Sequence, residues 1–83
     1  MGANLVFGRL GGADLTGAHL SGADLQYADF TRANLTGADL SYAMMNGADL
    51  SYANLTDAYI GDAYHLNEAI LTGATMPGGT IHD

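Results

Sequence analysis

The chain of 83 residues contains no cysteine and no tryptophan, and it has a single proline and only two basic residues. Without cysteine, neither a disulfide framework nor a thiolate metal site can form. Nine acidic residues against these two basic ones give a net charge of −7. Binding to a nucleic-acid backbone requires lysine and arginine in number. We therefore expect no direct nucleic-acid binding.

Long apolar runs are also missing, although 48% of the residues are hydrophobic. No segment approaches the roughly 18 consecutive apolar residues of a membrane-spanning helix. The first ten residues lack the basic start and the apolar stretch of a signal peptide. The sequence therefore predicts one small domain with no membrane association and a cytoplasmic location.

What the sequence does contain is a five-residue repeat. A large apolar residue recurs at every fifth position, and these residues are the predicted core ladder: Leu5, Leu10, Leu15, Leu20, Leu25, Phe30, Leu35, Leu40, Met45, Leu50, Leu55 and Ile60. Alanine or glycine stands two positions before each of them, aspartate or asparagine usually lies between, and two small or polar residues follow. The repeating unit is therefore Ala-(Asp/Asn)-Leu-x-x.

A period of five excludes a helix face, because a helix advances about 100° per residue and successive leucines would fall about 140° apart. The order alanine inward, aspartate outward, leucine inward fits a three-residue strand. Pairs such as Thr16-Gly17 then fit the corner that follows. Strands this short are unstable alone, so we expect a coil in which each strand pairs with the coils above and below. The period allows either a triangular or a four-sided coil.

The repeat resembles that of the pentapeptide-repeat proteins over nearly the whole chain. The resemblance implies an all-β fold, a right-handed quadrilateral β-helix with four units per coil and about four coils. Side chains twenty residues apart, such as Leu10, Phe30 and Leu50, would then stack in one column. With roughly 4.8 Å between stacked strands, the rod would be about 20 Å long. We expect a single domain over residues 1–83.

The repeat loses its register after Ile60. The next apolar position should be 65, but His65 stands there, and apolar residues resume at Leu66, Leu71, Met76 and Ile81. We interpret this as one extra residue between Gly61 and His65, a bulge at a corner, with His65 as a polar plug. Residues 1–62 would be regular repeats, and residues 63–83 a register-shifted last coil with its termination. After Pro77, two glycines would let the tail fold back.

None of the polar residues has the spacing of a catalytic or metal site. The aspartates share their slot with asparagine, so we interpret them as acceptors of hydrogen bonds from the turns. The histidines His19, His65 and His82 are scattered and match no metal-ligand motif. The corner serines and threonines have no histidine placed to activate them. The sequence predicts no catalytic residue, no cofactor and no metal, and thus not an enzyme.

Several large side chains fall outside the inward positions and are candidates for a protein interface: Met1, Val6, Phe7, Tyr27 and Met44. Phe7 and Tyr27 stand at equivalent corners one coil apart, so we expect them to stack. Aromatic residues and methionine are enriched where proteins meet, but aromatic rings at corners can also shield the corner backbone. Further tyrosines outside the inward positions are Tyr42, Tyr52, Tyr59 and Tyr64.

Three hypotheses for function follow. The first is a non-catalytic scaffold that binds an unidentified protein partner or itself, as a homodimer or end to end, through the N-terminal end, where the repeat has no polar cap. The second comes from the resemblance, because some pentapeptide-repeat proteins mimic DNA and inhibit DNA gyrase. The acidic composition agrees with this second hypothesis, but the carboxylates are not aligned on one face. The third is a fragment or an idealised repeat sequence.

Overall fold

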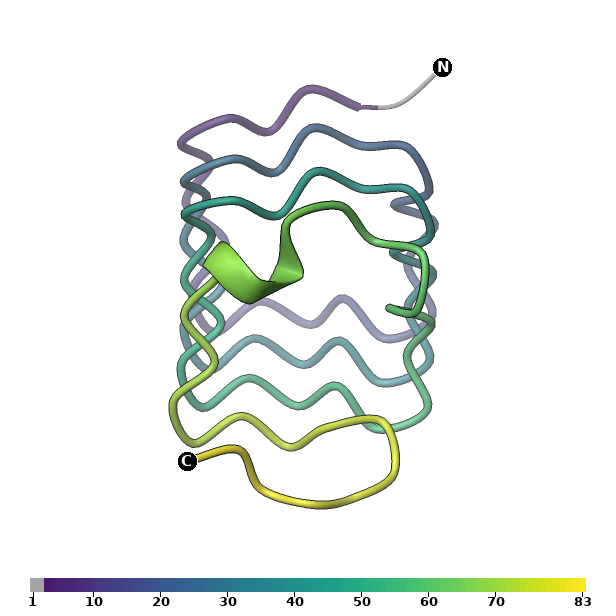
Figure 1. Ribbon diagram of the computed structural model, residues 1–83, viewed down its shortest axis with the longest axis vertical. Helices are drawn as coiled ribbons and strands as arrows, with labels where there is room; N and C mark the ends of the chain where they lie inside the picture. The colour runs from purple at the N-terminus through teal and green to yellow at the C-terminus, as the bar shows by residue number, and fades with distance from the viewer. Residues whose placement is uncertain (1–2) are drawn as a thin grey trace.

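The computed structural model describes residues 3–83, which wind into a rod whose two ends lie far apart (Figure 1). Parallel backbone pairs join residues twenty positions apart, as between Asn4 and Asp24. Paired positions recur every five residues, so each turn of the coil has four sides. The outward middle residues of the sides are 4, 24, 44 and 64 (side 1); 9, 29, 49 and 70 (side 2); 14, 34, 54 and 75 (side 3); and 19, 39 and 59 (side 4). We name each corner by the two sides that it joins.

Each side is paired with its neighbours by a bridge centred on its middle residue, so residues 3–83 contain isolated bridges and no continuous strand. At the first bridge, the Leu5 N–H donates to the Asp24 carbonyl and the Asp24 N–H donates to the Ala3 carbonyl, both at 2.8 Å. Each paired segment therefore spans three residues, as the sequence predicts, although the pairing does not extend into a continuous strand. The reason is that two residues of every five are used by a corner.

Each corner is a turn closed by a hydrogen bond back to the preceding core residue, as from the Gly8 N–H to the Leu5 carbonyl at 2.7 Å. At most corners the second residue has a positive φ, as the third residue of a type II turn requires, and Asp62 is an exception. Glycine occupies this slot at six corners of the coil, and other residues adopt a φ of 59° to 61° there: Phe7, Tyr27, Arg32, Tyr42, Tyr52 and Asp57. Most of the large side chains at this slot are exposed.

The predicted ladder fills the inside of the rod. Its buried members are Leu20, Leu25, Phe30, Leu35, Leu40, Met45, Leu50 and Leu55. Leu5, Leu10, Leu15 and Ile60, in the outer parts of the coil, are only partly buried and pack against this core. Alanines two residues before the ladder positions complete the interior, and no polar or charged residue of the described chain is buried. Alanine is required there because a thin coil has no space for two large side chains per side.

The spacing between paired residues changes from twenty to twenty-one in the last coil. Met44 still pairs with Tyr64, whereas Asp49 pairs with Ile70. The extra residue therefore lies after Tyr64, and the predicted position between Gly61 and His65 is wrong. A short 3-10 helix, η1 (Leu66–Glu68), follows at this point and projects from the coil in Figure 1. An exposed turn of this kind takes up one residue without disturbing the pairing on either side.

The prediction of His65 as a polar plug is also wrong. His65 precedes η1 with a φ of 58°, and its side chain is 54% exposed. The apolar Leu66 packs against the core in its place. An imidazole would lose its hydration on burial without gaining a partner, so the shift by one residue brings leucine inward and leaves histidine outside.

The C-terminal tail turns back on the last coil, as Pro77 and its glycines predict. Ile81 pairs antiparallel with Thr75, and the Met76 N–H donates to the Thr80 carbonyl at 2.7 Å. Gly79 adopts a φ of 92° in this turn, which glycine adopts without steric cost. The principal-axis extents are 30 × 23 × 19 Å.

Candidate interaction surfaces

The aspartates and asparagines on the outside of the coil hold the corners that follow them. Asp14 Oδ1 accepts hydrogen bonds from the Thr16 N–H at 3.2 Å and from the Thr16 hydroxyl at 2.7 Å. The same bond to the N–H two residues on is made by Asn4, Asp24, Asp29, Asn34, Asp39, Asp49 and Asn54. Their predicted role as acceptors of turn hydrogen bonds is confirmed.

These hydrogen bonds change the acidity of some of the carboxyl groups. The neighbouring hydroxyl, and then the backbone N–H of the same residue, hold the pKa below its ordinary value at Asp14, Asp29 and Asp39. Hydrogen bonds to the charged form of a carboxyl group favour that form. These outward carboxylates therefore stay ionised while they hold the corners.

An aromatic stack covers the corner between sides 1 and 2. The Phe7 and Tyr27 rings lie 5.4 Å apart and within 16° of parallel, which confirms the predicted stacking. The Tyr27 ring in turn lies over Gly47, where an added Cβ would come within 2.4 Å of two ring carbons. Tyr27 thus shields the corner backbone, as the alternative interpretation proposed. Val6, at the same corner, is half-buried, and the predicted interface residue Met1 lies outside the described residues.

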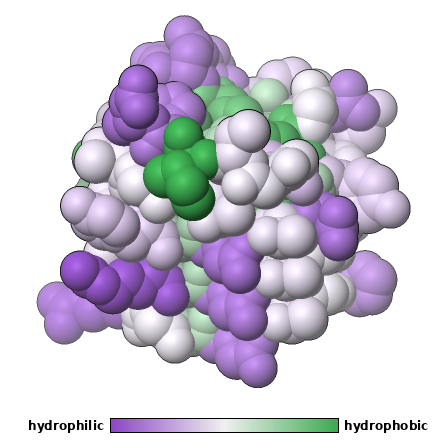
Figure 2. Space-filling view, turned by 90° about the horizontal axis from the view of Figure 1, so that it is seen from below, coloured by the Kyte–Doolittle hydropathy of each residue, from purple (hydrophilic) through white to green (hydrophobic). Residues whose placement is uncertain are grey.

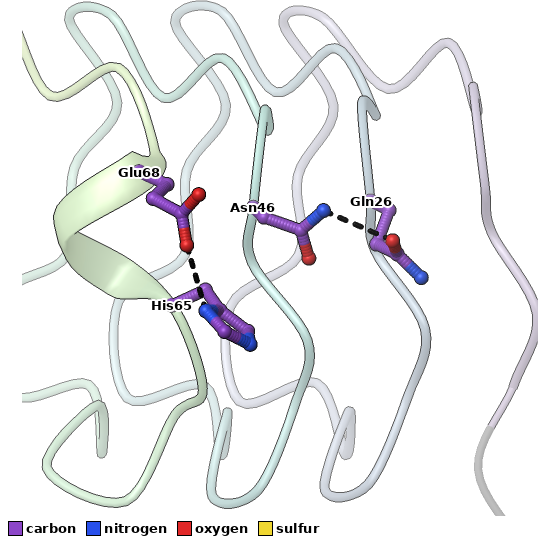
Figure 3. Close-up of polar contacts among 4 residues, drawn as sticks. All are labelled: Gln26, Asn46, His65 and Glu68. Atoms are coloured by element: carbon purple, nitrogen blue, oxygen red, sulfur yellow. Dashed lines mark hydrogen bonds and ion pairs between the residues drawn. The ribbon is translucent and has the colours of Figure 1, made fainter.

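A row of polar side chains runs along the same corner. Asn46 Nδ2 donates to Gln26 Oε1 at 2.9 Å, and the His65 Nδ1 lies 2.7 Å from Glu68 Oε2 beside η1 (Figure 3). The Oδ1 of Asn46 is buried and has no hydrogen-bond partner among the described residues. The sequence analysis missed this row, although the twenty-residue separation of Gln26 and Asn46 was the signal for it.

The corner between sides 2 and 3 carries a second column. The Arg32 guanidinium lies over the Tyr52 ring, 5.1 Å from its centroid, and this cation–π contact is favourable at exposed sites. The Tyr52 ring lies over Gly73, where an added Cβ would approach it to 2.4 Å. Tyr52 therefore has a partner on both of its faces. The other arginine, Arg9, lies on adjacent side 2.

The corner between sides 4 and 1 carries a different group of large side chains. We call it the aromatic corner, and it consists of Tyr42, Met44, Tyr59 and Tyr64. The Tyr42 and Tyr64 rings are 6.3 Å apart and tilted by 47°, and Met44 pairs with Tyr64 on side 1. All four side chains are exposed. Sequence reasoning selected only Met44 here, because the separate tyrosines meet only once the coil closes.

A model of pentapeptide repeats matches residues 1–37 and 28–63, with 8 copies of the repeat. The chain belongs to the pentapeptide-repeat family. Among solved structures it is similar to a pentapeptide repeat protein from the cyanobacterium Cyanothece 51142, with 33% identity and a TM-score of 0.78 over 96% of this chain and 54% of that one. It is also similar to one from the Arabidopsis thaliana thylakoid lumen, with 33% identity and a TM-score of 0.58 over 96% and 62%.

This pentapeptide-repeat chain therefore spans 54% and 62% of the lengths of those two relatives. No curated protein matches it. Within residues 3–83 there is no pocket and no group of three histidine, aspartate or glutamate residues that could hold a metal ion. The same part of the chain has no helix of the length and apolar character needed to cross a membrane.

The two ends of the pentapeptide-repeat coil differ. Core residues are partly exposed at both ends: Leu5, Leu10 and Leu15 at the first coil, and Ile60, Leu66, Leu71 and Met76 at the last. The outward residues of the first coil, Asn4, Arg9, Asp14 and His19, make no backbone hydrogen bond to another described residue. At the other end the tail covers the edge of side 3. That end is mostly hydrophilic or neutral, with one protruding hydrophobic group (Figure 2).

Proposed function

We propose that this pentapeptide-repeat protein is a non-catalytic scaffold that binds protein partners, including a second copy of itself. The observation that supports it is the set of large apolar side chains displayed on the outside of the coil: Phe7, Tyr27, Tyr42, Met44, Tyr52, Tyr59, Tyr64, Ile70 and Ile81. The core ladder fills the interior without them. Exposed aromatic residues and methionine are typical of protein interfaces.

The same proposal includes the complete fold that the family resemblance implies, a right-handed quadrilateral β-helix of about four coils. Parallel pairs at twenty-residue spacing support the four-sided coil. Hydrogen bonds join every coil to the next at several points. Flat sides held at fixed angles would suit a molecule that presents side chains to partners rather than enclosing a ligand.

For self-association we propose contact through the first coil. Its leucines are partly exposed, and its outward residues have backbone groups available for pairing. Two such edges can meet around a two-fold axis, which is the commonest symmetry of protein dimers. Burying apolar area is worth about 25 cal/mol per Å², and salt screens the repulsion between the two acidic chains. We expect the apolar burial to exceed that repulsion.

Light scattering of the 83-residue chain at near-physiological salt tests this proposal. We expect a dimer, and we expect Leu10→Asp to convert it to a monomer because the charge enters the contact. Ile81→Asp is the control, since Ile81 is exposed in the tail at the other end. Circular dichroism would establish that both variants remain folded. A monomeric parent chain contradicts the proposal, and a dimer that survives Leu10→Asp places the contact elsewhere.

The acidic composition favours a second candidate function, the DNA-mimic inhibitor of DNA gyrase. DNA carries one charge per roughly 1.7 Å, so a rod of about 20 Å would have to present about 12 charges, against a net −7 here. The outward aspartates are also divided among the four sides: Asp24 on side 1, Asp29 and Asp49 on side 2, Asp14 on side 3 and Asp39 on side 4. A gyrase supercoiling assay separates the two functions, because a scaffold should leave supercoiling unchanged.

A further inference from the structure

We propose that the aromatic corner, Tyr42, Met44, Tyr59 and Tyr64, is a docking surface for a basic segment of a partner protein that also carries aliphatic side chains. This inference rests on the proposed scaffold function and assigns to it one surface and one partner chemistry. Met44 and Tyr64 are paired on side 1, the Tyr42 ring at the turn contacts that of Tyr64, and Tyr59 lies on the adjoining side 4.

The aromatic corner holds four large exposed side chains, of which only Tyr42 and Tyr64 contact each other through their rings. Tyr42, Met44, Tyr59 and Tyr64 are 55%, 37%, 66% and 52% exposed. At the other corners the rings have partners, since Tyr27 lies between Phe7 and Gly47, and Tyr52 lies between Arg32 and Gly73. At the aromatic corner only the tilted contact between Tyr42 and Tyr64 is formed. The four side chains therefore keep apolar area that a partner can cover.

Carboxylates surround this apolar group. Asp24 is paired with Met44 along side 1, and Asp39 is paired with Tyr59 along side 4. At the turn itself, the Tyr42 N–H donates to the Asp62 carbonyl at 3.0 Å, which places the Asp62 side chain in the next coil of the same corner. For Asp24 and Asp39, Oδ1 is engaged in the bonds that hold the corners, whereas Oδ2 accepts no hydrogen bond from the described residues. These oxygens are available to basic groups.

The basic residues of the chain lie away from this surface. The only two, Arg9 and Arg32, lie on side 2 and at the corner between sides 2 and 3. The latter is diagonally opposite the aromatic corner. Two groups near the corner can gain positive charge on acidification: His19, which is paired with Asp39 on side 4, and His65, which follows Tyr64 in the chain and lies against Glu68. At neutral pH the surface is therefore negative around an apolar centre, and complementary charge directs it to lysine and arginine. Tyrosine faces also attract such cations.

Titration of the ¹⁵N-labelled chain with a short peptide of alternating arginine and leucine tests the inference by NMR. We expect the largest amide shifts at residues 42–44 and 59–64. The peptide should bind more weakly as salt is raised, since exposed charges are screened. A peptide of alternating glutamate and leucine should bind at least tenfold more weakly. Equal binding of the two peptides would overturn the charge assignment.

Matched variants locate the surface without threatening the fold. Tyr42→Gly and Met44→Asn place in these slots the residue types found there elsewhere in the coil, such as Gly22 and Asn4. The double variant should weaken peptide binding at least tenfold. Tyr52→Gly is the control, because Tyr52 has the same slot, nearly the same φ and similar exposure. It should leave binding within twofold.

The possible failures are distinguishable. Peptide shifts centred on another corner or on the first coil would overturn the docking surface but leave the scaffold function in place. Shifts spread over all aspartates, with no loss in the double variant, would show general attraction between charges and would also overturn it. The scaffold function itself fails only in the separate light-scattering and partner-binding measurements.

Discussion

The outward slot of the repeat is filled by aspartate or asparagine because a short side-chain oxygen reaches the N–H two residues on. In this chain the bond forms at every aspartate and asparagine of the slot, so charge is not required for it. Where a neighbouring hydroxyl donates a second hydrogen bond, the charged form of the aspartate is favoured and its pKa is lowered. The hydroxyls of Thr16, Thr31 and Ser41 are the largest cause of the lowered pKa at Asp14, Asp29 and Asp39.

A pH dependence of stability follows from these three carboxyl groups. A pKa that is lower in the folded chain contributes stability above the ordinary value of 3.8, and this stability is lost as the pH falls through the folded pKa. We expect the thermal midpoint of the parent chain to fall as the pH drops below about 4. The triple variant Asp14→Asn/Asp29→Asn/Asp39→Asn should show a flatter acid limb, because asparagine accepts the same bonds.

The control for this titration is Asp57→Asn/Asp62→Asn. These carboxylates accept none of the corner hydrogen bonds among the described residues, so their loss changes net charge without removing a bonded group. A double variant with an acid limb as flat as that of the triple variant would contradict the assignment. Thermal unfolding followed by circular dichroism at each pH provides the comparison.

Gly47 is the residue at which a small change should have a large effect. Gly47 and Gly37 have φ values of 73° and 69°, but only Gly47 lies beneath a tyrosine ring. Gly37→Ala should cost about 1 kcal/mol of the free energy of unfolding, from the left-handed backbone alone. Gly47→Ala should cost more, because its Cβ must displace the Tyr27 ring and disturb the stack with Phe7.

Urea denaturation in a double-mutant cycle measures this coupling. In a Tyr27→Gly background, Gly47→Ala should cost no more than Gly37→Ala, because the ring is absent. If Gly47→Ala still lowered the free energy of unfolding more than Gly37→Ala in the Tyr27→Gly variant, the Tyr27 ring would not be the cause of the difference.

At the scale of the repeat unit, the inward alanine sets the thickness of the coil. Ala38 is fully buried, whereas Ala18, in the same column of the first coil, is only partly buried. Ala38→Leu should lower the free energy of unfolding by roughly 1–3 kcal/mol or more, because the added atoms have no space. Ala18→Leu should cost clearly less. Equal costs in urea denaturation would show that inward space does not select alanine.

Much of the unit could be predicted from the sequence, because the five-residue period fixes which residues point inward and which form corners. The Phe7–Tyr27 stack was predictable once twenty residues were assigned to a coil. The position of the extra residue was not, because Ala63 and Tyr64 keep the pattern and either side of His65 could absorb the change. Only the backbone pairs, Met44 with Tyr64 and Asp49 with Ile70, decide it.

The candidate surfaces were less predictable than the unit. Met44 was noticeable because it replaces aspartate or asparagine in the outward slot. Tyr42 and Tyr64 occupy different slots, one at a corner and one on a side, so the twenty-residue spacing places Tyr64 beside Met44 but does not specify a contact between the two rings. Their contact depends on how the chain rises from one coil to the next, which composition and spacing do not define.

At the scale of the whole molecule, the described residues contain one 3-10 helix of three residues and no α-helix. We therefore predict a far-ultraviolet circular dichroism spectrum without the double minimum of an α-helical protein. A strong helical double minimum would contradict the coil and, with it, every surface described above.

The twenty-residue pairing distance of the regular coils has a consequence for how such a chain could change length in evolution. A duplication of twenty residues would add one full coil. Each side chain would still stack on side chains of the same column. A duplication of five residues would rotate the rest of the chain by a quarter turn about the coil axis. If it lay before Tyr42, that side chain would then stand at a different corner. Lengthening in steps of a whole coil therefore keeps each surface residue on the same side of the coil, whereas shorter steps move it to another side.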